Sequence, residues 1–300
     1  MKKRILALAT CFNRKSKTLR ALDSLTEGNP GLDISYVIAD DNSSDGTAEA
    51  LRKTENVIVV SGDGNSFYTG GMRLAMMKAL ELMRLPGERD RETTGLAEEI
   101  KKNPYDYILL FNDDVDFFPG AIERLAEKAE EKSKERGTDL IVYVGPACEN
   151  DGETLSYGGI ERKSNFRPKF RIVKADTEKG RKVNTFNANC VLVPAELFLK
   201  TGIMDKVYNH SLGDFDYGYM LVRNGAEIYV DSAYAGVCPD NTKKGTWDDP
   251  SLTRIERFKK KESIKGVPFR EFFHYLFKNY NFLTAIIYSL TPYAKILLGK

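Results

Sequence analysis

Short apolar runs alternate with stretches of helical periodicity through the first half of the chain. Each run is bounded by polar or turn residues, as buried strands are. The predicted strands cover residues 5–9, 34–39, 57–60 and 107–111, and the predicted helices cover residues 16–25, a segment from about 47, and residues 72–82. Ser16 is the expected N-cap of the first helix. Because parallel strands need crossover helices, this alternation predicts an α/β fold with an open, mostly parallel, Rossmann-like sheet and flanking helices.

The second half is less regular. Residues 140–144 and 190–193 predict strands, residues 151–182 predict loops and hairpins, and residues 86–104 predict an exposed polar excursion. Residues 269–280 predict a helix, followed by an apolar stretch over 282–290. The face of that helix combines Phe269, Phe272, Phe273, Leu276, Phe277 and Tyr280.

Composition and charge limit the classes of protein. The 300 residues are 42% hydrophobic and 29% charged, which suits one large α/β domain or two small ones. A net charge of +2 is too balanced for a surface that wraps nucleic acid. Residues 251–300, however, hold ten Lys or Arg and three Glu, so this basic tail carries +7 and the rest of the chain −5.

The four cysteines and the lengths of the apolar runs indicate where in the cell the protein is located. The cysteines form no C-x-x-C pair, residues 5–9 are too short for a signal peptide core, and no apolar run reaches the ~20 residues of a membrane span. We expect a cytoplasmic protein.

The first acidic cluster is Asp40-Asp41-Asn42-Ser43-Ser44-Asp45-Gly46-Thr47, directly after a predicted strand. Ligands of open α/β sheets bind beyond the carboxyl ends of the strands, where two adjacent carboxylates can accept from a base or a ribose hydroxyl. The alternative is a turn that only caps the next helix, a role that suits Ser44 and Asp45.

The second cluster is Asn112-Asp113-Asp114-Val115-Asp116, again after a predicted buried strand. Three carboxylates within four positions repel one another, and a divalent cation such as Mg²⁺ or Mn²⁺, shared with substrate phosphates, would balance them. A solvated acidic turn is the alternative.

The third cluster is Gly213-Asp214-Phe215-Asp216-Tyr217-Gly218-Tyr219. The chain has two histidines, so a general base is expected to be a carboxylate. The alternative is an N-cap aspartate that opens a helix through residues 217–223.

Taken together and in this order, the clusters resemble the inverting nucleotide-sugar glycosyltransferases of family 2, which have the GT-A fold. Further matching segments are Ala9-Thr10-Cys11-Phe12-Asn13-Arg14 and Gly64-Asn65-Ser66-Phe67-Tyr68-Thr69-Gly70-Gly71-Met72-Arg73, the second of which is similar to the rhamnosyltransferase-like branch. Asn112 stands in place of the first Asp of the family's D-x-D motif, and Gly213 in place of a Glu before the base. The resemblance covers roughly residues 5–240.

The resemblance implies roles for individual residues. Asp214 would be the catalytic base and Asp114 the metal ligand, with Mg²⁺ or Mn²⁺ as the cation. Asp216 and Tyr217 would be acceptor-side contacts. The nucleotide sugar would be bound by Thr10, Asn13, Arg14, Asp40, Asp41, Asn65, Arg73 and Asp113.

The expected organisation is a GT-A catalytic domain over residues 1–250 and a basic amphipathic helical tail over 251–300. The nucleotide-binding half would cover about residues 1–118 and the acceptor half about 119–250. The expected partners are a nucleoside-diphosphate sugar, a glycan or lipid-linked acceptor, and an anionic membrane surface that the tail would reach from the cytoplasmic side. The alternative for the tail is that the helix over residues 269–280 packs on the catalytic domain. Hexosyl or deoxyhexosyl transfer in cell-surface polysaccharide synthesis is the expected activity.

Two other functions stay open from the sequence. Asp114-Val115-Asp116 after a buried strand resembles the start of a haloacid dehalogenase-type phosphohydrolase motif, although Phe118 stands where that motif has Thr. A non-catalytic sugar- or membrane-binding adaptor on the same scaffold is the other.

Overall fold

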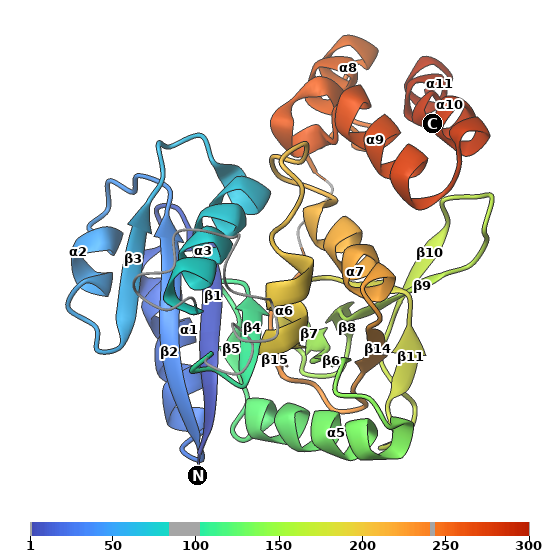
Figure 1. Cartoon of the computed structure of the whole chain (residues 1–300). Helices are drawn as coiled ribbons and strands as arrows, with labels where there is room; N and C mark the ends of the chain where they lie inside the picture. The colour runs from blue at the N-terminus through green and yellow to red at the C-terminus, as the bar shows by residue number, and fades with distance from the viewer. Residues whose placement is uncertain (1, 84–102, 241–243, 300) are drawn as a thin grey trace, which may run out of the picture.

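A mixed eight-stranded sheet organises the computed structural model, which describes residues 2–83, 103–240 and 244–299 (Figure 1). The strand order is β11-β14-β6-β13-β4-β1-β2-β3. Strands β3, β2, β1 and β4 run parallel, whereas β13 is antiparallel to both of its neighbours. The strands are β1 (Lys3–Cys11), β2 (Leu32–Asp40), β3 (Val57–Ser61), β4 (Tyr107–Phe111), β6 (Ile141–Val144), β11 (Arg181–Val183), β13 (Cys190–Pro194) and β14 (Glu227–Val230).

Helices cover both faces of this sheet. Strand β1 is buried on both sides: Leu6 and Leu8 belong to the core with α3, and Ile5, Ala7 and Ala9 to the core with α1 and α5. This two-sided burial is what a parallel sheet with crossover helices requires. The helices of this part are α1 (Lys15–Gly28), α2 (Thr47–Leu51), α3 (Phe67–Met83), α5 (Ala121–Arg136), α6 (Ala195–Thr201) and α7 (Gly213–Arg223).

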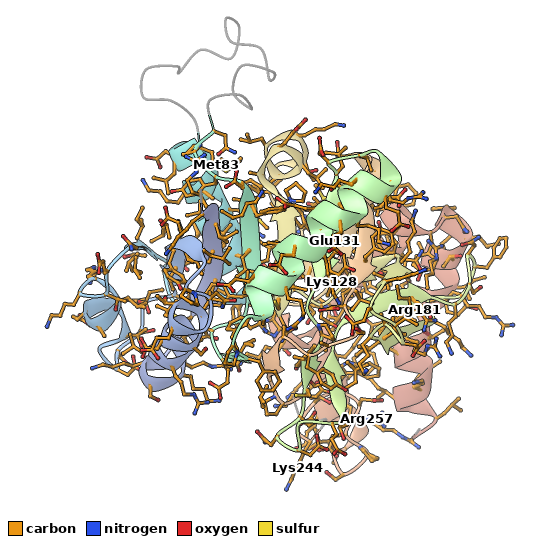
Figure 2. All side chains as sticks on the ribbon, turned by 90° about the horizontal axis from the view of Figure 1, so that it is seen from below. Met83, Lys128, Glu131, Arg181, Lys244 and Arg257 are labelled. Carbon is orange, nitrogen blue, oxygen red and sulfur yellow. The ribbon has the colours of Figure 1, made fainter. Side chains whose placement is uncertain are left out.

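Helix α5 is fixed across the sheet by a buried carboxylate. Asp231, just after β14, accepts from Arg124 Nε at 2.9 Å and from Lys128 Nζ at 2.6 Å. Figure 2 shows α5, with Lys128 and Glu131 labelled, crossing the molecule from below.

Two small sheets flank the main one on the second half of the chain. One has the order β10-β9-β12 and the other β5-β15-β7-β8. Their strands are β5 (Asp116–Phe117), β7 (Ala147–Cys148), β8 (Leu155–Tyr157), β9 (Gly159–Arg162), β10 (Phe170–Val173), β12 (Thr185–Phe186) and β15 (Gly236–Val237). The hairpin of β9 and β10 confirms the hairpin expected within residues 151–182.

The basic tail folds into short helices above α7 (Figure 1). They are α8 (Arg254–Glu262), the 3₁₀ turn η1 (Ile264–Gly266), α9 (Phe269–Asn279), α10 (Phe282–Ser289) and α11 (Thr291–Leu297). Asp216 on α7 accepts from Lys278 Nζ and Asn279 Nδ2 on α9, both at 2.7 Å. Tyr275, Leu276 and Ala285 share a core cluster with Phe215. Within the described residues, no helix is both long and apolar enough to cross a membrane.

The expected fold class is confirmed, with three local corrections. Helix α3 begins five residues earlier than residues 72–82 predict. Ser16 does not cap α1, whose N-cap is Arg14 without a side-chain cap; the Lys15 amide instead donates to Asp45 at 3.0 Å. On α9 the buried residues are Glu271, Tyr275, Leu276 and Asn279, whereas Phe269 and Phe277 are exposed. The excursion expected over residues 86–104 falls mainly on residues 84–102, outside the described part.

Candidate active site

A cavity of about 540 Å³ lies beyond the carboxyl ends of β1, β2 and β4. This is the edge at which open α/β sheets bind ligands, and the volume is in the range of small-molecule sites. Six of the predicted site residues line it: Thr10, Arg14, Asp41, Asp113, Asp114 and Asp214. The cavity therefore unites members of all three acidic clusters.

Asn13 joins the loops that follow β1 and β2. Its backbone adopts a φ of 51°, which Asn tolerates better than most residues. Its amide donates to Ser43 Oγ at 2.8 Å, and its side-chain oxygen accepts from the Ser44 amide at 2.8 Å. Asn13 itself is not among the cavity-lining residues, so its contribution is to hold the loop from which Arg14 extends.

The two aspartates after β2 have different environments. Asp40 is buried and accepts from the Ser43 amide at 3.0 Å, which closes its own turn. Asp41 lines the cavity, and its carboxylate accepts from the backbone amides of Gly64, Ser66 and Phe67 at 2.9 to 3.1 Å. Asp41 thus orders the glycine-rich loop and satisfies the first amide of α3.

Asn65 and Arg73 do not line the cavity. The Asn65 amide donates to Asp63 at 2.9 Å within its own loop. Arg73 donates from Nη1 to the Tyr208 carbonyl at 2.6 Å and ties α3 to the segment before α7.

Asp113 and Asp114 share one guanidinium after β4. Arg14 Nη1 lies 3.2 Å from Asp113 Oδ1 and 2.8 Å from Asp114 Oδ2. Thr18 Oγ1 donates to the other Asp113 oxygen at 3.1 Å. Burial raises the pKa of Asp113 to about 6, against the opposing effect of Arg14.

The donor set suits a hard cation completed by phosphate oxygens. Within the described residues, no three His, Cys, Asp or Glu side chains lie close enough together to enclose a metal ion. Mg²⁺ is usually held by one or two carboxylates plus substrate phosphates, so enclosure by protein is not required. Asp114 lines the cavity and is partly exposed, so it fits such an ion.

Asp214 lies on the cavity wall in the first turn of α7. Its carboxylate accepts from the Phe215 amide at 2.9 Å and from the Ala188 amide at 3.3 Å. Burial raises the pKa of Asp214 to about 6, although these two hydrogen bonds lower it. With this raised pKa the Asp214 carboxyl group is still mainly ionised at pH 7.

The glycine before Asp214 has a packing reason. A Cβ on Gly213 would overlap the side chain of Thr69 on α3. The glycine therefore lets the start of α7 approach α3 closely.

Asp216 and Tyr217 lie away from the cavity. Asp216 is fully buried on the α9 side, and Tyr217 is buried with its hydroxyl donating to the Gly202 carbonyl at 2.9 Å. Because α7 begins at Gly213, Asp214 and Asp216 point to different sides of a helix.

Several residues that line the cavity have no role predicted from the sequence. Tyr68 and Asn187 each have a buried side-chain oxygen without a hydrogen-bond partner in the described part of the chain. Cys238 Sγ lies 3.6 Å from Asp114 Oδ1. His210 and Lys265 also line the cavity. Lys265 belongs to the basic tail, so only the folded chain reveals that it reaches this site.

A comparison with known protein families matches the first part of the chain. Residues 7–81 match glycosyl transferase family 2. The matched segment runs from β1 into α3 and contains Arg14, Asp40 and Asp41. No curated protein matches the sequence.

Solved glycosyltransferases share the fold. Residues 1–349 of TarS from S. aureus superpose with a TM-score of 0.51 at 14% identity, covering 99% of this chain and 81% of that one. The mannosyltransferase PcManGT from Pyrobaculum calidifontis, solved with GDP-Man and Mn²⁺, gives 0.50 at 14%, covering 100% and 74%. Longer TarS gives 0.50 at 15%, covering 85% of this chain, and the match spans 39% of TarS. The fold is thus that of GT-A glycosyltransferases.

Proposed function

We propose that this protein transfers a sugar from a nucleoside-diphosphate sugar to an acceptor hydroxyl, with inversion at the anomeric carbon. The observation that carries the proposal is that Asp214 shares one cavity with Arg14, Asp113 and Asp114. An inverting transfer needs a base on the acceptor side and charge neutralisation at the leaving diphosphate. The family match over residues 7–81 and the solved complexes of neighbours with GDP-Man or UDP-GlcNAc support the donor class.

In this proposal Asp214 accepts the proton of the attacking hydroxyl. The oxygen of the acceptor forms the new bond to the anomeric carbon while the bond to the diphosphate breaks. A pKa of about 6 makes Asp214 a stronger base than an ordinary aspartate while leaving it ionised at pH 7. The backbone amides of Phe215 and Ala188 fix its orientation.

In this proposal the diphosphate of the donor binds on the side of Asp114. Asp114 would hold Mg²⁺ or Mn²⁺, and the cation would supply positive charge to offset the negative charge of the leaving nucleoside diphosphate. Thr10 and Asp41 line the donor side directly, whereas Asn13, Asp40, Asn65 and Arg73 support the surrounding loops. Asp216 and Tyr217 act through packing of α7 rather than by contact with an acceptor.

The phosphohydrolase alternative is less well supported. It needs Asp114 and Asp116 to face one site, but Asp116 begins β5 and pairs with Arg20 at 2.6 Å, and it is not among the cavity-lining residues.

The proposed acceptor is a membrane lipid-linked glycan of cell-surface polysaccharide synthesis. Helix α10 supports this acceptor, because the pattern of its buried and exposed residues is the reverse of that in a helix of a soluble protein. Thr284, Ala285 and Ser289 are buried, whereas its large apolar residues are exposed: Phe282, Leu283, Ile286 and Ile287. Phe269, Phe273 and Phe277 form a stacked row on α9 that continues to Phe282.

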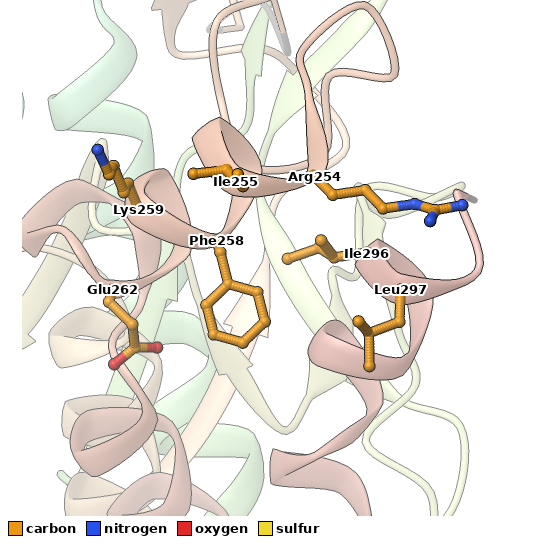
Figure 3. Close-up of a pocket in the computed structure, with 7 residues that line it drawn as sticks. All are labelled: Arg254, Ile255, Phe258, Lys259, Glu262, Ile296 and Leu297. Carbon is orange, nitrogen blue, oxygen red and sulfur yellow. The ribbon is translucent and has the colours of Figure 1, made fainter.

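Charge favours an anionic bilayer as the partner of this surface, which we call the α9–α10 apolar face. The three glutamates of the tail are engaged within the protein: Glu256 with Thr253, Glu262 with Tyr293, and Glu271 with Asn209. Lys259, Lys260, Arg270 and Lys295 are exposed. A second copy would bring two strongly basic tails together, whereas anionic lipid attracts each basic side chain by about 1 kcal/mol. Figure 3 shows a further apolar groove in the tail, between α8 and α11, which is lined by Phe258, Ile296 and Leu297 among others.

Incubation with a panel of nucleotide sugars and Mg²⁺ or Mn²⁺ tests the function. We expect release of one nucleoside diphosphate, accelerated by a lipid-linked acceptor and lost in Asp214→Asn. Release of inorganic phosphate would instead identify a phosphohydrolase, and donor binding without turnover in the presence of membrane extracts would identify an adaptor.

A further inference from the structure

Among the described residues that line the cavity, Lys265 is the cation without an ionic partner. Four aspartates line the cavity: Asp41, Asp113, Asp114 and Asp214. Arg14 is already engaged by two of them. Lys265 makes no ion pair with any described residue, although it faces the same cavity from the turn η1 of the tail. A diphosphate entering a cavity rich in carboxylates needs such a free positive charge.

The turn that carries Lys265 is tightly built. Lys261 is 1% exposed, and its ammonium donates to the Val267 carbonyl and lies 5.1 Å from the centre of the Tyr293 ring. A Cβ on Gly266 would overlap the Lys260 carbonyl. The backbone on both sides of Lys265 is therefore held against α8, so its side chain starts from a fixed point.

His210 lies on the same cavity wall and within the electrostatic range of Lys265. Burial, and then the charge of Lys265, lower the pKa of His210, so its imidazole is neutral at pH 7. Its Nδ1 atom is buried without a hydrogen-bond partner among the described residues. The Asn209 side chain beside it is held by Glu271 of α9 at 2.8 Å, and the Thr69 hydroxyl donates to the His210 carbonyl at 2.7 Å.

We propose that Lys265 and His210 form a phosphate-binding subsite, through which the tail completes the active site. Lys265 supplies the charge and His210 a neutral N–H donor. The phosphate belongs either to the diphosphate of the donor or to the phosphate of a lipid-linked acceptor, which have the same chemistry. This inference rests on the proposed function for the identity of those substrates but not for the binding of phosphate.

Calorimetric titration of the full chain with a panel of nucleoside diphosphates, in the presence of Mg²⁺, tests the subsite. For the nucleotide that binds, we expect Lys265→Ala to weaken binding about tenfold or more, because a hydrogen bond to a charged group is lost. Lys265→Arg should restore most of the affinity, and the corresponding free nucleoside should bind both proteins equally. Lys259→Ala is the matched control, since it removes the same charge from α8 outside the cavity (Figure 3).

Farnesyl diphosphate, titrated in parallel, distinguishes the two sources. Weaker binding of the nucleotide assigns the subsite to the donor, and weaker binding of farnesyl diphosphate alone assigns it to the acceptor. Equal affinities of wild type and Lys265→Ala for both probes overturn the subsite. A wild-type protein that binds farnesyl diphosphate but no nucleoside diphosphate contradicts the proposed function, while the farnesyl diphosphate comparison still tests Lys265.

Discussion

Asp214 and Asp216 are two residues apart, yet they occupy opposite environments. Asp214→Asn keeps the size of a cavity-lining carboxylate but removes its basicity, so we expect kcat to fall by about 10²-fold or more with little change in donor affinity. Asp216→Asn weakens the buried contact with Lys278 and should mainly lower the free energy of unfolding, by about 2 kcal/mol. Steady-state kinetics and urea unfolding of both variants measure this. The opposite ranking of the two kcat values would refute Asp214 as the base.

The raised pKa of Asp214 predicts the acid limb of activity. With a pKa of about 6 in the free enzyme, kcat/KM should decline as the pH falls through about 6.

The raised pKa of Asp214 has the opposite effect on stability. The folded state binds the proton more tightly than the unfolded chain, so this stabilisation is complete below the ordinary aspartate pKa and is lost as the pH rises through about 6. Denaturation at pH 5 and 7.5 should show a loss of about 1 kcal/mol that Asp214→Asn lacks. The same change in the free energy of unfolding for wild type and Asp214→Asn between these pH values would contradict this prediction.

Asp114 is the third residue with a specific expectation. Asp114→Ala should abolish transfer and remove the metal dependence of nucleoside diphosphate binding, because the diphosphate would then face Asp113 without the cation. The fold should persist, since this side chain lies at the cavity surface. The measurement is titration of the variant with the nucleoside diphosphate, with and without EDTA. Near wild-type turnover of Asp114→Ala in EDTA would show that no metal acts at this site.

Single residues could be predicted where chemistry and strand position coincide. Asp114 and Asp214 follow from acidic clusters beside apolar runs, and the structure brings both to one cavity. Arg73 could not be placed in this way, because its partner is a backbone carbonyl at Tyr208, far along the chain. Lys265 and His210 carry no local motif, so only the packing of the tail reveals their proximity.

At the scale of elements, buried strands were the most predictable. Residues 107–111 were predicted as a strand and form β4 with the same bounds, since a short apolar run leaves little choice. The start of α3 was missed because its cap is not local: Asp41, from the end of β2, accepts the Ser66 and Phe67 amides. The α9 face was misjudged because periodicity identifies an apolar stripe but not what covers it.

The turn η1 gives a prediction at this scale. Gly266→Ala places a methyl group against the Lys260 carbonyl, so the turn must shift at a cost of about 1–3 kcal/mol. We expect a lower melting temperature together with weaker binding of nucleoside diphosphate, since Lys265 moves with the turn. Gly28→Ala is the control for the loss of a glycine, since a Cβ there would come no closer than 3.4 Å to a neighbouring atom. A destabilised Gly266→Ala protein with full affinity would separate the turn from the site.

At the scale of the molecule, the tail links the cavity to a surface. Its inner side contributes Lys265 to the cavity and Glu271 to the support of Asn209, and its outer side exposes the α9–α10 apolar face. A lipid-linked acceptor would contact the tail on both sides, at the cavity and at the α9–α10 apolar face. The sequence predicted a basic tail but left open whether its aromatic helix packs on the domain or on a membrane. The structure shows that α9 packs on α7 while part of its aromatic row stays exposed, so the two roles are compatible.

Sedimentation with lipid vesicles tests this arrangement. We expect the protein to pellet with vesicles that contain phosphatidylglycerol and much less with pure phosphatidylcholine, and the difference should shrink as salt screens the basic tail. The double variant Leu283→Asp/Ile287→Asp should lose the binding, because it puts two negative charges on the α9–α10 apolar face. Met77→Asp, at an exposed apolar residue of α3, should bind as wild type does. Equal binding to neutral and anionic vesicles would contradict the role of charge. If the wild type is a dimer in solution and the double variant is a monomer, the α9–α10 apolar face binds a second copy instead.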